Sequence, residues 1–229
     1  MLASSVRITV AALARMLRQH RLTVPPVLDT TPVFTDAAES RALDAAMWQE
    51  FGELGLVARG GGLTPGALDT LSVLGRANVE YFGWFHVCCR DYSLVVAELG
   101  EDAVVAVRGS HSVRITPVGD AALPETLIRY LPQTRPARID AVNVRRDAAG
   151  DDSVVRQLAA QEPTGLGELY VAVRDRLARR RTTTEPVRYR DTAQGRVLVR
   201  LTEDYLSLAP ANDQLLAGRL REAHQELAG

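Results

Sequence analysis

The chain has 229 residues, 46% of them hydrophobic, which is enough to bury a sizeable core and disfavours a disordered protein. Its formal net charge of −1 disfavours a general nucleic-acid or membrane-surface binder. A signal peptide and an apolar run long enough to cross a bilayer are both missing, so we expect the protein to stay in the cytoplasm.

The first third of the chain predicts one strand and three helices. The expected elements are a strand over 5–10, a helix over 11–20, a loop over 23–35, and helices over 36–54 and 64–74. The loop follows from Pro25-Pro26, which interrupts regular structure. Asp36 and Glu39 have the spacing of a capping box. Thr64 followed by Pro65 is typical of an N-cap with proline at the first helical position.

Residues 79–117 are the most informative segment and predict four strands joined by very short turns. In the first of these strands, apolar side chains occupy both alternating faces. Tyr81, Gly83, Phe85 and Val87 fall on one face, and Phe82, Trp84, His86 and Cys88 fall on the other. Both faces therefore need cover, from the chain's own helices or from a partner. This requirement favours a binding scaffold over an enzyme.

The second half of the chain repeats the order of helices followed by strands. The expected elements are a short helix over 124–131, an edge strand or connector over 138–144, a mobile loop over 147–152, helices over 151–161 and 165–181, three strands between 186 and 209, and a final helix over 212–227. The helix over 165–181 depends on the spacing of Leu166, Leu169, Tyr170, Val173 and Leu177. We therefore predict an α+β fold in which a single domain, 1–229, has two similar halves, 1–120 and 121–229.

Two groups of side chains support the competing hypothesis of a hydrolase or transferase. Ser110-His111 places a nucleophile beside a base, but no third group is seen to orient the base, so a solvated hairpin tip is favoured. Cys88 and Cys89 are adjacent in an apolar strand, which favours reduced, structural thiols over a reactive one or a disulfide. The four histidines lack metal-ligand spacing, and we expect neither a metal nor a cofactor.

An arginine cluster supports a third hypothesis, a nucleic-acid-binding module. Its members are Arg174, Arg176, Arg179, Arg180 and Arg181. The favoured interpretation is that these cations complement the dipole at the end of the helix predicted over 165–181. Trp48, Trp84 and Tyr170 are expected to be core residues.

Several segments together resemble the EspG family. They are the S-x-x-[IL]-T-V start, the F-x-x-L-G-L-V helix end over 51–57, the G-G-x-L-T-P segment after it, the LVVAELGEDAVVAVRGSHSVRITPV meander, the arginine-ended segment 166–181, and the closing hairpin and helix. The resemblance covers nearly the whole chain and is one of pattern and register.

The resemblance implies a non-enzymatic, cytosolic chaperone of type VII secretion in actinobacteria. The implied fold is a central antiparallel sheet flanked by helical bundles, in two quasi-symmetric halves. The implied partner is a PE/PPE-like secreted heterodimer whose apolar tip the chaperone shields, with no nucleic acid and no membrane insertion; a homo-oligomer is left open. The family's partner contacts carry over to Arg90, Asp91 and Tyr92 near a turn, and to Leu215, Leu216 and Arg219 on the final helix.

Overall fold

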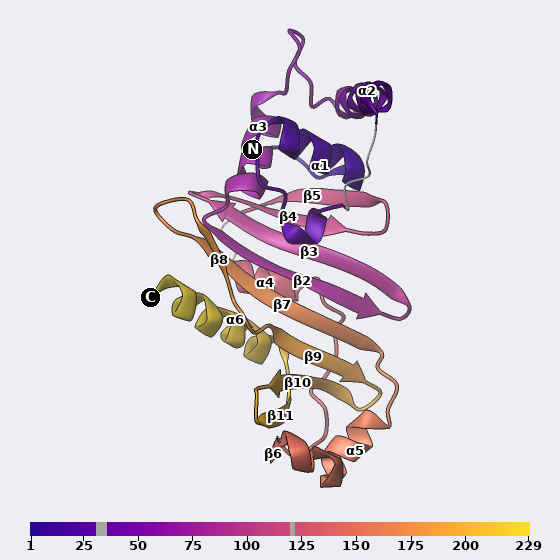
Figure 1. The fold of residues 1–229 in the computed structure, drawn as a ribbon, viewed down its shortest axis with the longest axis vertical. Helices are drawn as coiled ribbons and strands as arrows, with labels where there is room; N and C mark the ends of the chain where they lie inside the picture. The colour runs from indigo at the N-terminus through magenta and orange to yellow at the C-terminus, as the bar shows by residue number, and fades with distance from the viewer. Residues whose placement is uncertain (31–35, 120–121) are drawn as a thin grey trace.

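The structure, a computed structural model, describes residues 1–30, 36–119 and 122–229 and is built around one antiparallel sheet (Figure 1). The strands are β1 (Val6–Thr9), β2 (Val79–Val87), β3 (Arg90–Leu99), β4 (Asp102–Arg108), β5 (Ser112–Val118), β6 (Val142–Arg145), β7 (Gly165–Arg174), β8 (Arg180–Thr182), β9 (Val187–Thr192), β10 (Gly195–Leu201) and β11 (Tyr205–Pro210). The helices are α1 (Val10–Gln19), α2 (Ala37–Glu53), α3 (Pro65–Arg76), α4 (Leu123–Ile128), α5 (Ser153–Ala159) and α6 (Asp213–Ala228), with 3₁₀ turns η1 (Pro26–Leu28) and η2 (Arg146–Asp151).

The strand order is the same in both halves when it is read outward from the centre. The order across the sheet is β1-β5-β4-β3-β2-β7-β9-β10-β11-β6, with β8 attached to β7. The two halves meet where β2 pairs with β7 over the whole length of β2, from Val79 opposite Val173 to Val87 opposite Gly165. This arrangement confirms the predicted α+β fold with two quasi-symmetric halves. The expected boundary between the halves, 120/121, lies outside the described residues.

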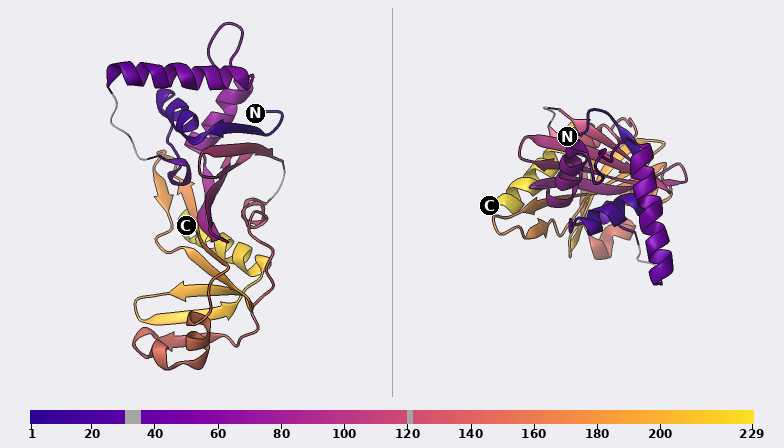
Figure 2. Two further views of the ribbon diagram at one scale, coloured as in Figure 1. Left: turned by 90° about the vertical axis from the view of Figure 1, so that its right-hand side faces the viewer. Right: turned by 90° about the horizontal axis from the view of Figure 1, so that it is seen from above.

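Helices cover the two faces of the sheet unequally. We call face A the side that carries Phe82, Trp84 and His86, and face B the side that carries Tyr81 and Phe85. Helices α1 to α3 cover one end of face A and α5 covers the other end, whereas α4 and α6 pack on face B (Figures 1 and 2). Within residues 1–30, 36–119 and 122–229, no α-helix lies over the middle of face A. No helix among the described residues has the length and apolarity that a membrane span requires.

Most of the local signals of the first half are confirmed. The four strands predicted over 79–117 are β2 to β5, and the turns from β3 to β4 and from β4 to β5 lie where expected. The turn from β2 to β3 lies at Cys88 and Cys89, which were expected in a strand. The Thr64 hydroxyl accepts a hydrogen bond from the backbone N–H of Ala67 at 3.3 Å, as an N-cap should. The Asp36 carboxylate accepts two backbone bonds at the start of α2. The predicted loop over 23–35 contains η1, and its residues 31–35 lie outside the described part of the chain.

The helix predicted over 165–181 is wrong, because this segment forms β7, a turn and β8. Leu169 and Val171 are fully buried on face B, so the apolar residues follow a period of two as well as a helical one. Pairing with β2 and β9 decides between the two periods. In the same half, the predicted edge strand is β6, and the segment expected to be a mobile loop contains η2.

The arginine cluster consequently lies on the β7–β8 hairpin and not at a helix end. Arg180 pairs with the buried carboxylate of Glu80, with its Nη2 atom 2.8 Å from Oε2. Arg174 donates to backbone carbonyls at the end of α3, and Arg179 pairs with Asp175 at 2.9 Å. Most of the cluster therefore stabilises the hairpin, which weakens the nucleic-acid hypothesis.

Replacing Gly83 by alanine is expected to lower the free energy of unfolding by roughly 2–3 kcal/mol, because the added carbon overpacks the junction of the two halves. A Cβ atom at Gly83 would lie 2.5 Å from the backbone oxygen of Glu168 and 2.8 Å from the Phe85 ring. Urea denaturation followed by circular dichroism measures the change. Gly52→Ala on α2 is the matched control, since nothing lies within 4 Å of its added carbon. Equal stability of the two variants would contradict the tight β2–β7 junction.

Stability is expected to fall between about pH 10 and 12, where the unfolded chain loses tyrosine protons that the buried tyrosines on face B of the native chain still hold. Burial raises the pKa of Tyr81 from 10.0 to about 12, and its hydroxyl lies 2.7 Å from the Nδ1 atom of His224. Because the native pKa is raised, the unfolded chain loses this proton first, so the contribution is complete below pH 10 and is lost as pH rises through 12. Urea unfolding at pH 9 and pH 11 measures the slope. Tyr81→Phe is expected to flatten it, and an unchanged slope would contradict this origin.

Candidate partner-binding site

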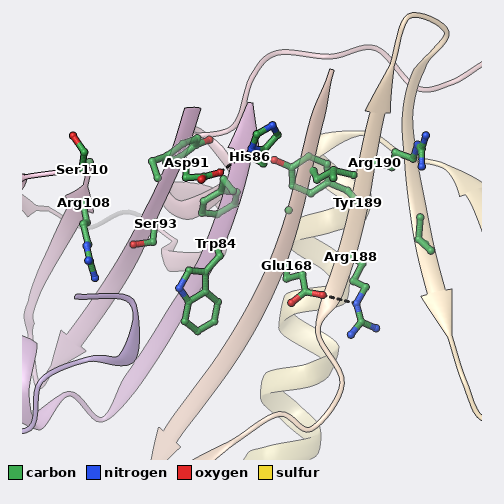
Figure 3. A pocket seen from close by; sticks show the side chains of 16 residues that line it. Trp84, His86, Asp91, Ser93, Arg108, Ser110, Glu168, Arg188, Tyr189 and Arg190 are labelled. Carbon is green, nitrogen blue, oxygen red and sulfur yellow. Dashed lines mark hydrogen bonds and ion pairs between the residues drawn. The ribbon is translucent and has the colours of Figure 1, made fainter. Parts of the chain in front are cut away.

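The uncovered middle of face A forms a groove of about 830 Å³ (Figure 3). Its floor consists of side chains from β3, β2, β7, β9 and β10, which the strand register arranges in two rows. Its rim includes Arg108, Gly109 and Ser110 at the end of β4. The loop at η1 borders the same side, where the Ser93 hydroxyl donates to the Val27 carbonyl at 2.7 Å. We call this feature the face A groove.

The first row is Ser93, Trp84, Glu168, Arg188 and Val199, each opposite the next across neighbouring strands. The Nε atom of Arg188 donates to Glu168 at 2.8 Å, and both side chains are more than a third exposed. The second Glu168 oxygen accepts a 3.0 Å hydrogen bond from Tyr170. Burial, followed by this contact with Glu168, raises the pKa of Tyr170, so the hydroxyl stays protonated as a donor. The charges of this row are therefore satisfied within the chain.

The second row is Asp91, His86, Leu166, Arg190 and Val197. The Nδ1 atom of His86 lies 2.7 Å from Asp91. Leu166 is 38% exposed, although it lies on a central strand. Arg190 donates to the Gln161 carbonyl, but it pairs with no carboxylate among the described residues, and its Nε atom is buried without a hydrogen-bond acceptor. The second row thus leaves Leu166 exposed to water and leaves Arg190 without a counter-charge among the described residues.

Trp84 is 43% exposed, so the prediction that it is a core residue is wrong. Phe82 and Tyr170 stack with ring centroids 5.5 Å apart, and Trp84 makes edge contacts with both. These contacts hold the indole in place while one side of it faces the groove. Trp48 and Tyr170 are half-buried against the core beneath α1 to α3. Trp84 is therefore a fixed aromatic surface and not part of a closed core.

The predicted contact residues near the turn lie on both sides of β3. Arg90 and Asp91 are exposed, and Asp91 belongs to the groove. Tyr92 alternates to face B, where it stacks on Phe85 with centroids 4.8 Å apart and donates to the Tyr130 carbonyl. Burial raises the pKa of Tyr92 to about 12. Only Asp91 of these three thus presents its charge to the face A groove.

The predicted contact residues on α6 lie behind the sheet, on face B. Arg219 is exposed and pairs with Glu222 at 2.7 Å. Leu215 is partly buried, and Leu216 is fully buried in the face B core. Leu216 therefore supports the packing of α6 and offers no surface to a partner in this conformation. The structure does not bring the α6 residues into the face A groove.

The groove residues Leu166, Glu168, Arg188 and Arg190 were not predicted as site residues. One signal for them exists in the sequence, since Arg188 and Arg190 alternate with buried Tyr189 and so must share one face of a strand. What the sequence does not contain is which strands lie beside them. The mistaken helix over 165–181 also concealed Leu166 and Glu168.

The candidate catalytic groups do not form a catalytic arrangement among the described residues. The His111 ring lies 2.9 Å from the Ser110 hydroxyl on an exposed turn, but no described carboxylate bonds to His111. Cys88 and Cys89 are not in an apolar strand as expected. Both are exposed, with φ angles of 45° and 67°, in the turn between β2 and β3. Residues 1–30, 36–119 and 122–229 contain no group of three potential metal ligands.

Comparisons with known proteins identify the family of this chain. A model of the EspG family matches residues 9–222. The structure is similar to that of the Mycobacterium tuberculosis type VII secretion system chaperone EspG5, which was solved in complex with a PE25–PPE41 dimer. The likeness has a TM-score of 0.67 at 15% identity and covers 95% of this chain and 94% of EspG5. No curated protein matches the sequence. The family match spans nearly the whole sequence, and the chain therefore belongs to the EspG family.

Proposed function

We propose that this chain is a chaperone of type VII secretion that binds a PE/PPE-like heterodimer and shields its apolar tip. The proposed contact surface is the face A groove together with the exposed end of β2 and β3 at Arg90 and Asp91. Tyr92 would support this end from face B. Leu215 and Arg219 on α6 remain a second proposed contact, on the opposite face of the sheet.

The observation that carries the proposal is the groove in the middle of a sheet that is otherwise covered. Trp84 and Leu166 leave an apolar surface open to water, and such a surface is typical of an interaction site. Family membership supports the chaperone role, as does the likeness to EspG5, whose structure holds a PE–PPE dimer. An apolar groove that is temporarily covered by a partner's tip would protect both surfaces from aggregation.

We further propose that the protein acts by binding alone, in the cytoplasm, and that residues 1–229 behave as one unit. The Ser110–His111 pair lacks an orienting carboxylate among the described residues, which favours binding over hydrolysis. The continuous β2–β7 pairing joins the halves over nine residue pairs, which favours a single cooperative unit. One calorimetric unfolding transition would support this unity, and two separated transitions would contradict it.

Replacing Trp84 by alanine is expected to weaken binding of the PE/PPE-like pair by at least about 30-fold, because Trp at the centre of an interface is typically a hot spot. The pair is produced with the chaperone from the host's own secretion locus, and affinity is measured by surface plasmon resonance. Leu177→Ala is the matched control. Its side chain is also an exposed apolar group, 72% exposed, but it lies on the β7–β8 turn at the other end of β7.

The outcomes separate the two proposed surfaces. Loss of binding in Trp84→Ala with normal binding in Leu177→Ala supports the groove. Loss of binding only in Leu215→Ala or Arg219→Ala would show that the partner contacts α6 and not the groove. If the wild-type chain binds no such pair, the chaperone proposal is wrong.

A further inference from the structure

We infer that the face A groove selects a helical partner segment in which a carboxylate lies three or four residues from a large apolar side chain. The inference rests on the proposed function for the role of the groove, and it adds the chemistry by which the groove recognises its partner. It starts from the second row, where the partly exposed Leu166 lies opposite Arg190, an arginine that pairs with no carboxylate among the described residues. Arg190 is labelled in Figure 3.

Arg190 is a cation on the floor of the groove that pairs with no carboxylate among the described residues. Arg188 is neutralised by Glu168, and Asp91 lies against His86. Arg190 lies opposite Leu166 on one side and Val197 on the other, so apolar side chains surround its stem. Its Nε atom is buried without an acceptor among the described residues. The side chain as a whole is partly exposed in the groove, and a carboxylate is the group that matches the geometry of a guanidinium, so a partner's carboxylate can pair with Arg190.

Arg108 adds a second cation at the opposite rim. Its Nη1 atom donates to the Asp29 backbone carbonyl at 2.6 Å, so the bond neutralises no charge. Three arginines and two carboxylates thus line the groove, although the whole chain has a net charge of −1. The groove is therefore locally positive, and this favours an acidic partner.

The spacing of the row favours a helix as the occupant. Leu166 and Arg190 face each other across neighbouring strands, where Cβ atoms are about 4.5–5.5 Å apart. Side chains three or four residues apart on a helix have nearly the same separation, about 5–6 Å. A helix that crosses β7 and β9 can therefore place one apolar side chain on Leu166 and Trp84 while a carboxylate reaches Arg190.

The floor of the groove argues against a nucleic acid as the occupant. Trp84 offers one aromatic surface, but Leu166 and Val199 are aliphatic and give no stacking partner for successive bases. With Arg188 already paired, Arg190 and Arg108 are too few cations to follow a phosphate backbone.

The test uses three synthetic helical peptides that are identical except for one position, four residues after a central leucine, which is Glu, Gln or Lys. Isothermal titration calorimetry with the full chain measures their affinities. The Glu peptide is expected to bind at least about 10-fold more tightly than the Gln peptide, and the Lys peptide most weakly, because a charge-assisted bond is replaced by a neutral one and then by repulsion. In Arg190→Gln this preference is expected to disappear.

Two further variants make the test specific. Arg181→Gln, at an exposed arginine of β8, is the matched control and keeps the preference. Leu166→Gln weakens all three peptides but keeps their order, so it tests the site even if Arg190→Gln fails to fold. Equal affinities for the three peptides, no binding of the Glu peptide, or a preference that persists in Arg190→Gln would overturn the inference. Strongly salt-dependent binding of a single-stranded oligonucleotide in place of the peptides would overturn it as well.

The results for the inference and for the proposed function can be told apart. If the secreted pair binds but the peptides show no charge preference, only the inference is wrong. If the peptides show the preference but no secreted pair binds, the chemistry of the groove stands and the chaperone role is wrong.

Discussion

Replacing Arg196 by leucine is expected to lower the free energy of unfolding by about 3–5 kcal/mol, because it leaves a buried carboxylate without its counter-ion. Arg196 is fully buried at the start of β10, and its partner Asp191 is only 2% exposed. The guanidinium donates to both Asp191 oxygens, at 2.7 and 2.9 Å. It also donates to the Pro132 carbonyl and to Asp213 at the first turn of α6.

The same contacts explain why this arginine remains charged. Burial is the largest single effect and alone would lower its pKa, but the hydrogen bonds that Arg196 donates to Asp191 and the charges of Asp191 and Asp213 together outweigh burial and raise the pKa of Arg196 above its usual value. The guanidinium also lies over the Tyr189 ring, 4.5 Å from the centroid. The hydrogen bonds of the Arg196 guanidinium therefore connect β10 to β9, to α6 and to the segment after α4.

Urea denaturation of the variant and the wild-type chain measures the effect. Arg219→Leu is the matched control, because Arg219 forms an exposed pair with Glu222, and it is expected to change the free energy of unfolding by less than about 1 kcal/mol. The double variant Arg196→Leu/Asp191→Leu is expected to lose less free energy of unfolding than the sum of the losses in the two single variants. The reason is that it no longer contains a buried Asp191 carboxylate without a counter-ion. A loss below about 1 kcal/mol in Arg196→Leu would show that the buried pair is not needed.

The parts of the fold that sequence predicts well are those that local interactions determine. The meander of β2 to β5 follows from alternation and tight turns, and the starts of α2 and α3 follow from the caps at Asp36 and Thr64. The α+β fold and the EspG family were both predicted and are confirmed. Each of these signals lies within a few residues of the element that it specifies.

β7 shows where local reasoning fails. Its leucines and valines satisfy a helical period and a strand period equally, so the sequence alone does not decide between them. The contact that favours the strand is between Gly167 and the Tyr189 ring on β9. A Cβ atom at position 167 would lie 2.2 Å from that ring, so only glycine fits there. That contact joins residues far apart in sequence, and it requires the strand pairing to be known first. The groove was missed for the same reason, since its two rows exist only in the assembled sheet.

The turn between β2 and β3 shows a second limit. The apolar neighbours of Cys88 and Cys89 predict a strand, but both residues adopt the positive φ angles that a two-residue turn needs and that cysteine rarely takes. No turn-forming residue marks this position in the sequence. The pairing of β2 with β3 from Val87 and Arg90 onward sets the turn instead.

Replacing Leu216 by alanine is expected to lower the free energy of unfolding by about 2–5 kcal/mol, because its side chain is fully buried and the cavity cannot close completely. Leu216 packs in the face B core with Leu127 of α4 and Leu169 of β7. The cavity would therefore weaken the packing among α4, α6 and the central strands. Urea denaturation of the two chains measures it.

Leu215→Ala is the control that separates a structural role from a contact with the partner. It makes the same substitution one residue earlier on α6, at a partly buried side chain, so a smaller loss of about 1 kcal/mol is expected. If α6 contacts the secreted pair, Leu215→Ala and Arg219→Ala should weaken binding while the chain stays folded. Leu216→Ala should then reduce binding only in proportion to the unfolded fraction. A Leu216→Ala chain that remains as stable as the wild type yet loses its partner would show that this leucine leaves the core when the partner binds.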